Sequence, residues 1–584
     1  MKNNQQDLPA FLPMTRTEML ARGWDELDIL IVSADAYVDH PAFGTAMVGR
    51  WLESKGFRVG IIAQPDWRDS DSVEALGRPR LFAAISGGAV DSMLNLFTAN
   101  KKRRSEDDYS PGGRNDRRPP RATIVYANLL SRVFPRLPLV IGGVEASLRR
   151  LVHYDYWDDC VRSSILLDSG ADLLIYGMGE RAILEAARRI ESADKRGLKY
   201  IAGTVFAGEE ADLPGAERTI FLPSREEIER EPAKLIEATL AAHDHVNPYS
   251  RNYIAQRDGE RLVIEAEPAR PLSERELDAL YELPFTRRAH PSYKEKIPAL
   301  EPVKFSITVH RGCYGGCTFC GLGLHQGKAI QSRSVASILR EIRRLASMPD
   351  FKGIISDLGG PSANMYGTTC KMEHGRTGKP CARRSCLFPA PCKHLNASHA
   401  RSLEMLDGVS SLPEVRRALI ASGVRFDLAL LDARYIEALA ARHTGGHLSV
   451  APEHCVEKIL RLMGKPPIKV FEKFRERFER ASRAAGKEQY VVPYLISSFP
   501  GSTEKDMAEL RTYLKEQHLR SEQVQDFIPL PMTLACAMFY AGRGLDGKTI
   551  PVARGSAKLR QQSHIKPHKK FCERHLTRPC KRRK

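Results

Sequence analysis

The chain has 584 residues, 42% of them hydrophobic, and a formal net charge of +18, which is an ordinary composition for a soluble globular protein. This length predicts more than one domain. No stretch approaches the roughly 18 apolar residues of a membrane span, and the first residues lack the apolar segment of a secretory signal. Twelve cysteines are too few for a secreted disulfide scaffold of this size. We therefore expect a cytoplasmic protein with no membrane partner.

Residues 1–200 carry buried-strand patterns interrupted by an amphipathic helix with Phe43, Met47, Trp51 and Leu52 on one face. This series predicts a doubly wound, Rossmann-like parallel sheet, which binds ligands beyond the carboxyl ends of its strands. The strand patterns are 27–32, 57–63, 81–86, 137–141 and 172–177.

Two zones of the sequence have less regular patterns. One is inserted in this domain, and the other follows it. The charged stretch from about 100 to 122 has few apolar residues and is expected to form an exposed loop. Residues 201–300 mix strand patterns such as 261–266 with polar helices and prolines, and they are expected to form a connecting subdomain. No chemistry can be assigned to either zone.

Three thiols lie within eight residues, at Cys313, Cys317 and Cys320, directly after a short apolar strand pattern at 304–310. Glycines in the loop allow it to turn tightly and bring the sulfurs around one centre. A cubane iron–sulfur cluster ordinarily has four thiolate ligands, so three would leave one iron open. The alternatives are a zinc site, which needs a fourth ligand and usually paired C-x2-C spacings, and an unliganded turn.

With Phe319 before the last cysteine, this segment resembles the C-x3-C-x-aromatic-C motif of the radical S-adenosylmethionine (SAM) superfamily. The resemblance implies a [4Fe-4S] cluster on the three cysteines, SAM on the open iron, and reductive cleavage of SAM to a 5′-deoxyadenosyl radical. It also implies a partial (βα)6 barrel over residues 301–550. The electron donor would be a flavodoxin- or ferredoxin-like partner.

Further candidates for SAM binding lie at the ends of later strand patterns. Gly359, Gly360 and Pro361 resemble the superfamily's glycine-rich element, whose backbone receives the amino group of SAM. Glu453 ends the strand pattern 447–453 and is a second candidate. The alternative for Glu453 is a carboxylate placed at a helix N-terminus, where the helix dipole favours it.

Over nearly the whole chain, segments 141–150, 153–157 and 357–366 resemble the YgiQ family of radical SAM proteins. This resemblance implies radical chemistry but identifies neither a substrate nor catalytic residues. The N-terminal layout also resembles the cobalamin-binding domains that precede many radical SAM barrels. Those that displace the lower axial base use an Asp-x-His-x-x-Gly loop, which residues 39–44 do not match. We therefore predict that His40 is a loop or capping residue rather than a cobalt ligand, and cobalamin is not the favoured cofactor. The alternatives are a degenerate domain and one that binds cobalamin without a histidine ligand.

A second cysteine group falls in an irregular insertion at residues 361–398. Three readings remain open for it, namely an auxiliary iron–sulfur cluster, a zinc site and a loop of unliganded thiols, because spacing alone does not select the metal. Its members are Cys370, Cys381, Cys386 and Cys392.

The C-terminal segment 551–584 contains twelve Lys or Arg residues and one Glu, and so carries +11 of the net charge of +18. It has little apolar material and is expected to be disordered. A basic tail can bind RNA through counterion release or can simply keep the protein soluble. The favoured function is a radical SAM enzyme of unknown substrate. The alternatives are a radical SAM enzyme that modifies RNA and a non-catalytic, metal-stabilised nucleic-acid-binding protein.

Overall fold

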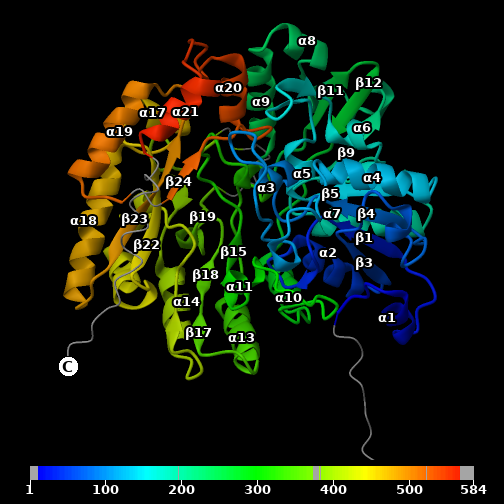
Figure 1. The fold of residues 1–584 in the computed structure, drawn as a ribbon, viewed down its shortest axis with the longest axis horizontal. Coiled ribbons are helices and arrows are strands. Elements are labelled where there is room, and N and C mark those ends of the chain that lie inside the picture. Colours follow the sequence, from blue (N-terminus) through cyan, green and yellow to red (C-terminus); the bar gives the residue numbers. More distant parts are fainter. Residues whose placement is uncertain (1–10, 195, 373–380, 382, 521–522, 566–584) are drawn as a thin grey trace, which may run out of the picture.

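The structure, a computed structural model, describes residues 11–194, 196–372, 381, 383–520 and 523–565. It is an α/β protein with two sheet systems that lie side by side (Figure 1). The N-terminal system is drawn in blue through cyan to the green of β11 and β12, and the second, partial-barrel system runs from green to orange. No helix of the described residues is both long enough and apolar enough to cross a membrane.

A nine-stranded sheet of order β10-β11-β12-β9-β8-β5-β4-β1-β3 forms the N-terminal domain. Its parallel centre is doubly wound, as predicted, and every residue of β1 is buried, as expected for strands covered by helices on both faces. The covering helices include α2 (Gly44–Glu53), α4 (Ala122–Val133) and α7 (Glu180–Glu191). The parallel strands are β1 (Ile29–Ser33), β3 (Val59–Ala63), β4 (Phe82–Ser86), β5 (Leu139–Gly142) and β8 (Leu173–Ile175).

The expected domain boundary at residue 200 is wrong, because four later strands continue the same sheet. β9 pairs antiparallel with β8, β12 with β9 and β11 with β12, while β10 lies parallel to β11. These edge strands bury alternating apolar residues against helices such as α9 (Lys234–His245), which ties them to the N-terminal core. The strands are β9 (Thr204–Gly208), β10 (Thr219–Leu222), β11 (Tyr253–Asp258) and β12 (Arg261–Glu265).

The stretch 100–122 is only partly the exposed loop that its composition suggests. Residues 101–106 are exposed, but Arg118 is completely buried and forms ion pairs with Asp35 and Asp107. Composition misleads here because the buried charges of Arg118, Asp107 and Asp35 are paired with one another, and burial of a charge is tolerated when it is paired and hydrogen-bonded.

The second half contains the strand–helix alternation expected of a partial barrel. β14 (Ser306–Thr308) pairs parallel with β18 (Asp357–Gly359), and β17 (Ile354–Ile355) pairs parallel with β21 (Arg417–Ala418). A parallel bridge between Val424 and Val450 connects this part to a parallel sheet of β22 (His447–Glu453), β23 (Tyr490–Ser497) and β24 (Gln523–Asp526). The helices packed outside include α13 (Val335–Ala346), α14 (Ala400–Ser410), α17 (Glu457–Met463), α18 (Ile468–Ala484) and α19 (Glu504–Glu516).

The C-terminal segment returns to the N-terminal domain, and the expectation of disorder from residue 551 is wrong for its first part. α20 (Leu534–Ala541) lies beside α9, and α21 (Gly555–Ser563) follows it (Figure 1). Lys558 is buried and donates to the carbonyl oxygens of Ala99 and Phe527 and to the hydroxyl of Tyr156. The rest of the expected tail, residues 566–584, lies outside the described residues.

Candidate functional site

The three-cysteine loop leaves β15 (His310–Arg311) and ends at the short helix α12 (Leu322–His325). Its backbone is held from several directions: Cys313 donates its amide to the Gly327 carbonyl, and Thr318 donates to the carbonyl oxygens of Met463 and Leu462. Gly312 has a φ of +91°, and a side chain there would meet the carbonyl of Ala329 at 2.1 Å. The loop therefore has a fixed path, which the glycine makes possible.

Glycine is also needed at two positions of the loop that lie close to the cysteine sulfurs or to the second cysteine segment. A Cβ at Gly315 would lie 3.4 Å from the Sγ of Cys313 and 3.9 Å from the Sγ of Cys317, so these two thiols face the same space. A Cβ at Gly316 would collide with Ser385 at 2.6 Å, because the second cysteine segment packs directly on this turn. Ser385 donates its hydroxyl to the Gly315 carbonyl at 2.7 Å.

Arg425 provides positive charge beside the thiols. Its Nη1 donates to the Sγ of Cys317 at 3.5 Å, while its Nη2 pairs with Asp427 at 2.6 Å. Burial raises the pKa of Cys313, and it raises the pKa of Cys320 to about 12 with help from the two neighbouring thiols. Metal ligation would therefore displace protons from these thiols, as thiolate ligation does in general.

Glu453 lies close enough to the cysteine loop for its charge to act on Cys320. It is buried at the end of β22 with a φ of +71°, an unusual backbone conformation for a residue other than glycine. Its Oε1 lies 3.6 Å from the Nζ of Lys465, and its charge contributes to the raised pKa of Cys320. Burial raises the pKa of Glu453 itself, against the opposing effect of Lys465. Strained residues of this kind concentrate at functional sites.

The glycine pair lies beside the loop, at the end of β18. Gly359 is in register with Thr308 of β14, and the ring of His310 fills the space next to Gly360, where a Cβ would come within 2.4 Å of it. Glycine at this position is therefore needed for packing within the protein, apart from any close approach of SAM. Pro361 follows and faces the cavity described below. Phe319 packs edge to face on Phe499, with 6.3 Å between ring centroids.

The second cysteine group gathers next to the first. The amide of Cys386 donates to the Tyr314 carbonyl at 3.1 Å, and the amide of Cys392 donates to the Cys386 carbonyl at 2.8 Å. Cys370 lies in β19 (Thr369–Cys370), which pairs with β20 (Leu395–Asn396). Burial and the thiols of Cys392, Cys381 and Cys370 raise the pKa of Cys386 to about 11, so all four thiols interact.

The donor sets of both groups suit iron–sulfur or zinc chemistry, since each consists of thiols. Within the described residues, no three Cys, His, Asp or Glu side chains already stand at the positions of metal ligands.

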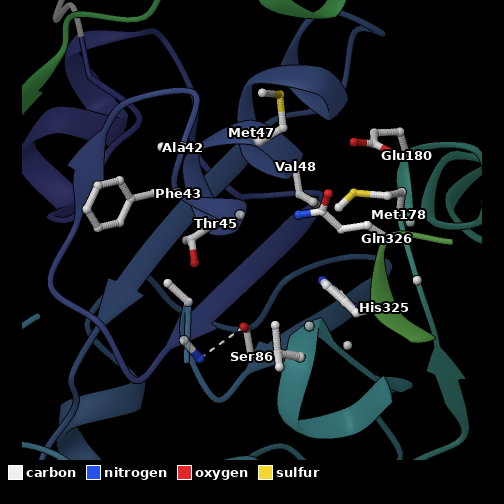
Figure 2. Close-up of a pocket in the computed structure, with 18 of the residues that line it drawn as sticks. Ala42, Phe43, Thr45, Met47, Val48, Ser86, Met178, Glu180, His325 and Gln326 are labelled. Atoms are coloured by element: carbon white, nitrogen blue, oxygen red, sulfur yellow. Dashed lines mark hydrogen bonds between the residues drawn. The ribbon is translucent and has the colours of Figure 1, made fainter. Parts of the chain in front are cut away.

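A cavity of about 420 Å³ lies between the N-terminal sheet and the barrel. One wall comes from the carboxyl ends of β1, β4, β5 and β8 and the start of α2, as expected for a doubly wound sheet. The other wall comes from the barrel and includes His310, Gly360 and Pro361. Figure 2 shows Val48 of α2 near Met178 and Gln326 in this cavity.

His40 lies in the loop before α2, where its Nδ1 accepts from the Ala42 amide at 3.0 Å and its Nε2 lies 2.9 Å from Arg287. This is the loop role that the sequence predicts for it. Arg425, Lys465 and His310 were missed by sequence reasoning, because no local motif distinguishes them from the other basic residues and histidines.

Comparison with known proteins confirms the resemblance seen in the sequence. Residues 11–306 match the family described as Radical SAM N-terminal, and residues 307–514 match the Radical SAM superfamily. A UPF0313 protein of Geobacter sulfurreducens is 49% identical over 95% of this chain and 92% of its own length. A UPF0313 protein of Methanocella arvoryzae is 46% identical over 91% of this chain and 88% of its own length.

Two solved structures are similar at lower identity. The radical SAM methyltransferase TsrM of Kitasatospora setae is 14% identical, with a TM-score of 0.49 over 86% of this chain and 74% of that chain. The cobalamin-dependent radical SAM enzyme OxsB is 11% identical, with a TM-score of 0.46 over 90% of this chain and 56% of that chain. These values are too low to transfer a ligand or a reaction. On its family matches and its relatives, the chain belongs to the UPF0313, or YgiQ, family of radical SAM proteins.

Proposed function

We propose that the protein is an iron–sulfur enzyme that reductively cleaves SAM to methionine and a 5′-deoxyadenosyl radical, which acts on a further substrate. The observation that carries the proposal is the loop of Cys313, Cys317 and Cys320, whose thiols share one buried space beside Arg425. A [4Fe-4S] cluster held there by three thiolates would supply the electron for SAM cleavage and an open iron for SAM itself.

The chain's own residues have separate tasks in this scheme. Cys313 and Cys320 give up their protons when they ligate, and Arg425 stabilises negative charge on the sulfur of Cys317. Glu453 offers a buried carboxylate to the cationic amino group of SAM, with Lys465 holding that carboxylate in place. We also propose that SAM contacts Gly359, Gly360, Pro361 and Phe319.

The electron would come from a low-potential donor of the flavodoxin or ferredoxin type. We have no observation that favours RNA as the substrate, since most of the basic tail lies outside the described residues. The second cysteine group is proposed to hold an auxiliary iron–sulfur cluster or zinc beside the first site. The contact of Ser385 with Gly315 supports this adjacency.

The test is anaerobic reconstitution with iron and sulfide, followed by paramagnetic resonance of the reduced protein with and without SAM. We expect a [4Fe-4S] signal that changes when SAM binds the open iron, and formation of 5′-deoxyadenosine with dithionite as reductant. Cys317→Ala should abolish both the SAM-dependent change and 5′-deoxyadenosine. Cys160→Ala, an exposed thiol on β7 (Cys160–Arg162), should behave as wild type. Zinc in place of iron, or SAM cleavage that survives Cys317→Ala, would refute the proposal.

A further inference from the structure

The cavity between the sheet and the barrel is built for a small molecule. Its volume of about 420 Å³ lies within the range of roughly 300–1,000 Å³ typical of small-molecule sites. Most of its wall is apolar, from residues such as Val48, Met47, Val140 and Ile141. An apolar wall of this kind suits a mainly apolar ligand.

The cavity wall carries no unpaired formal charge among the residues that the structure describes. Glu180 is paired with Arg311, and Asp35 is paired with the buried Arg118. His325 lies at the wall with Ser147 as its partner, and burial lowers its pKa to about 4, so its ring is neutral at pH 7. A charged ligand would find no oppositely charged side chain free to pair with it here, and burial of an unpaired charge is costly.

His310 links the cavity to the cluster loop. It is completely buried three residues before Cys313, its ring lies against Gly360, and neither ring nitrogen has a hydrogen-bond partner among the described residues. His310 lines the cavity, but both of its ring nitrogens are buried, so the ring closes the cavity wall on the side of the cluster loop.

Two helices add hydrogen-bond donors at the opposite wall. α2 begins after Phe43 and α7 begins after Gly179, and neither has a side chain capping its first turn. Residues at both helix starts line the cavity, and the first amides of a helix have no partner within the helix itself. A ligand with an apolar body and acceptor oxygens on its edge would match this wall.

We infer that the cavity is the substrate chamber of the radical reaction, and that the substrate is an uncharged, mainly apolar small molecule bound between α2 and His310. This inference rests on the proposed function. In the reaction, a hydrogen atom would pass from a carbon–hydrogen bond of this molecule to the 5′ carbon of the radical. The products of that step are 5′-deoxyadenosine and a substrate radical, and the step itself uses no other oxidant or reductant.

The binding test uses two dyes of similar size, neutral Nile red and anionic anilinonaphthalene sulfonate, on the reconstituted full-length protein. We expect one Nile red molecule to bind saturably. Val48→Trp and Ala42→Trp place a large side chain in the cavity and should each weaken this binding about tenfold or more. Val125→Trp makes the same kind of change on α4, outside the cavity, and should leave binding unchanged. Thermal unfolding identifies any variant that fails to fold, and Ala42 is exposed enough to accept the larger side chain.

Nile red binding that is not saturable, or that is the same in Val48→Trp and wild type, would overturn the inference. If the anionic dye bound in the cavity more tightly than Nile red does, the inference that the substrate is uncharged would be overturned.

The turnover test measures 5′-deoxyadenosine with fractions of a cell extract as the added probe. The uncharged fraction below about 1 kDa should stimulate wild type and Val125→Trp but neither cavity variant. The inference would be overturned if the RNA fraction stimulated 5′-deoxyadenosine formation, or if no fraction did. The proposed function is judged separately, by the basal SAM cleavage that wild type shows without any fraction and that Cys317→Ala should lack.

Discussion

Replacement of Arg118 by methionine should destabilise the N-terminal domain, because two buried carboxylates would lose the cation they share. Arg118 is completely buried, and its Nη2 lies 2.6 Å from Asp35 while its Nε lies 2.9 Å from Asp107. Its Nη1 also donates to the Gly87 carbonyl at 2.8 Å. Removing one partner of a buried ion pair destabilises proteins by about 3–5 kcal/mol. We expect a loss of that size in the free energy of unfolding.

The loss of unfolding free energy in Arg118→Met has an upper limit and depends on pH. A buried carboxylate without its cation can take up a proton, which at pH 7 costs about 4 kcal/mol from an ordinary pKa near 3.9. Burial already raises the pKa of Asp35 in the wild type. A carboxyl whose folded pKa is raised binds more protons in the folded state, so its folded form gains stability as the pH falls. The deficit of Arg118→Met relative to wild type should shrink by about 1.4 kcal/mol per pH unit for each carboxylate that protonates.

The assay is urea unfolding followed by tryptophan fluorescence. All four tryptophans, Trp24, Trp51, Trp67 and Trp157, lie in the N-terminal domain, so the signal reports on this domain. Arg114→Met is the matched control, because the Arg114–Asp116 pair in the same stretch is exposed to solvent and should contribute little to stability. Adding Asp107→Asn to Arg118→Met should restore part of the loss. Equal losses in Arg118→Met and Arg114→Met, or a deficit that does not change between pH 7.5 and 5.5, would refute the reasoning.

Two further predictions concern the second cysteine group and the buried histidines. Cys386→Ala should lower the iron or zinc content of the reconstituted protein while the cluster signal of the first site remains, and an unchanged metal count by mass spectrometry would contradict a second site. Burial lowers the pKa of His243 to about 3 and that of His399 to about 4. The unfolded chain then binds more protons below pH 6.5, so stability should fall by up to about 1.4 kcal/mol per pH unit for each histidine as the pH drops toward 4. His399→Phe should reduce this slope in urea unfolding, and a slope equal to wild type would contradict it.

The parts of the fold and site that could be predicted are those encoded in short segments. The cysteine loop, the glycine pair and the strand before each of them are local patterns, and the structure has them in the expected elements. Arg425 could not be predicted as a partner of Cys317, because the contact joins residues 108 positions apart and depends on the barrel closing. The helix α21 was missed for a related reason. Its sequence is polar, and it is held by buried hydrogen bonds of Lys558 to distant backbone atoms rather than by an apolar face.

The two halves are joined most closely where the proposed chemistry would occur. Arg311, which follows His310, pairs with Glu180 at the start of α7, and a Cβ at Gly321 would touch Leu148 of α5 (Gly143–Leu148). The N-terminal domain therefore contacts the strand before the cysteine loop and the turn after it. Since the Arg311–Glu180 contact borders the cavity, a molecule bound there would touch one of the elements that fix the loop. Binding at the sheet edge and the position of the cluster cysteines should be coupled for this reason, and substrate should alter the cluster's paramagnetic signal even before any turnover.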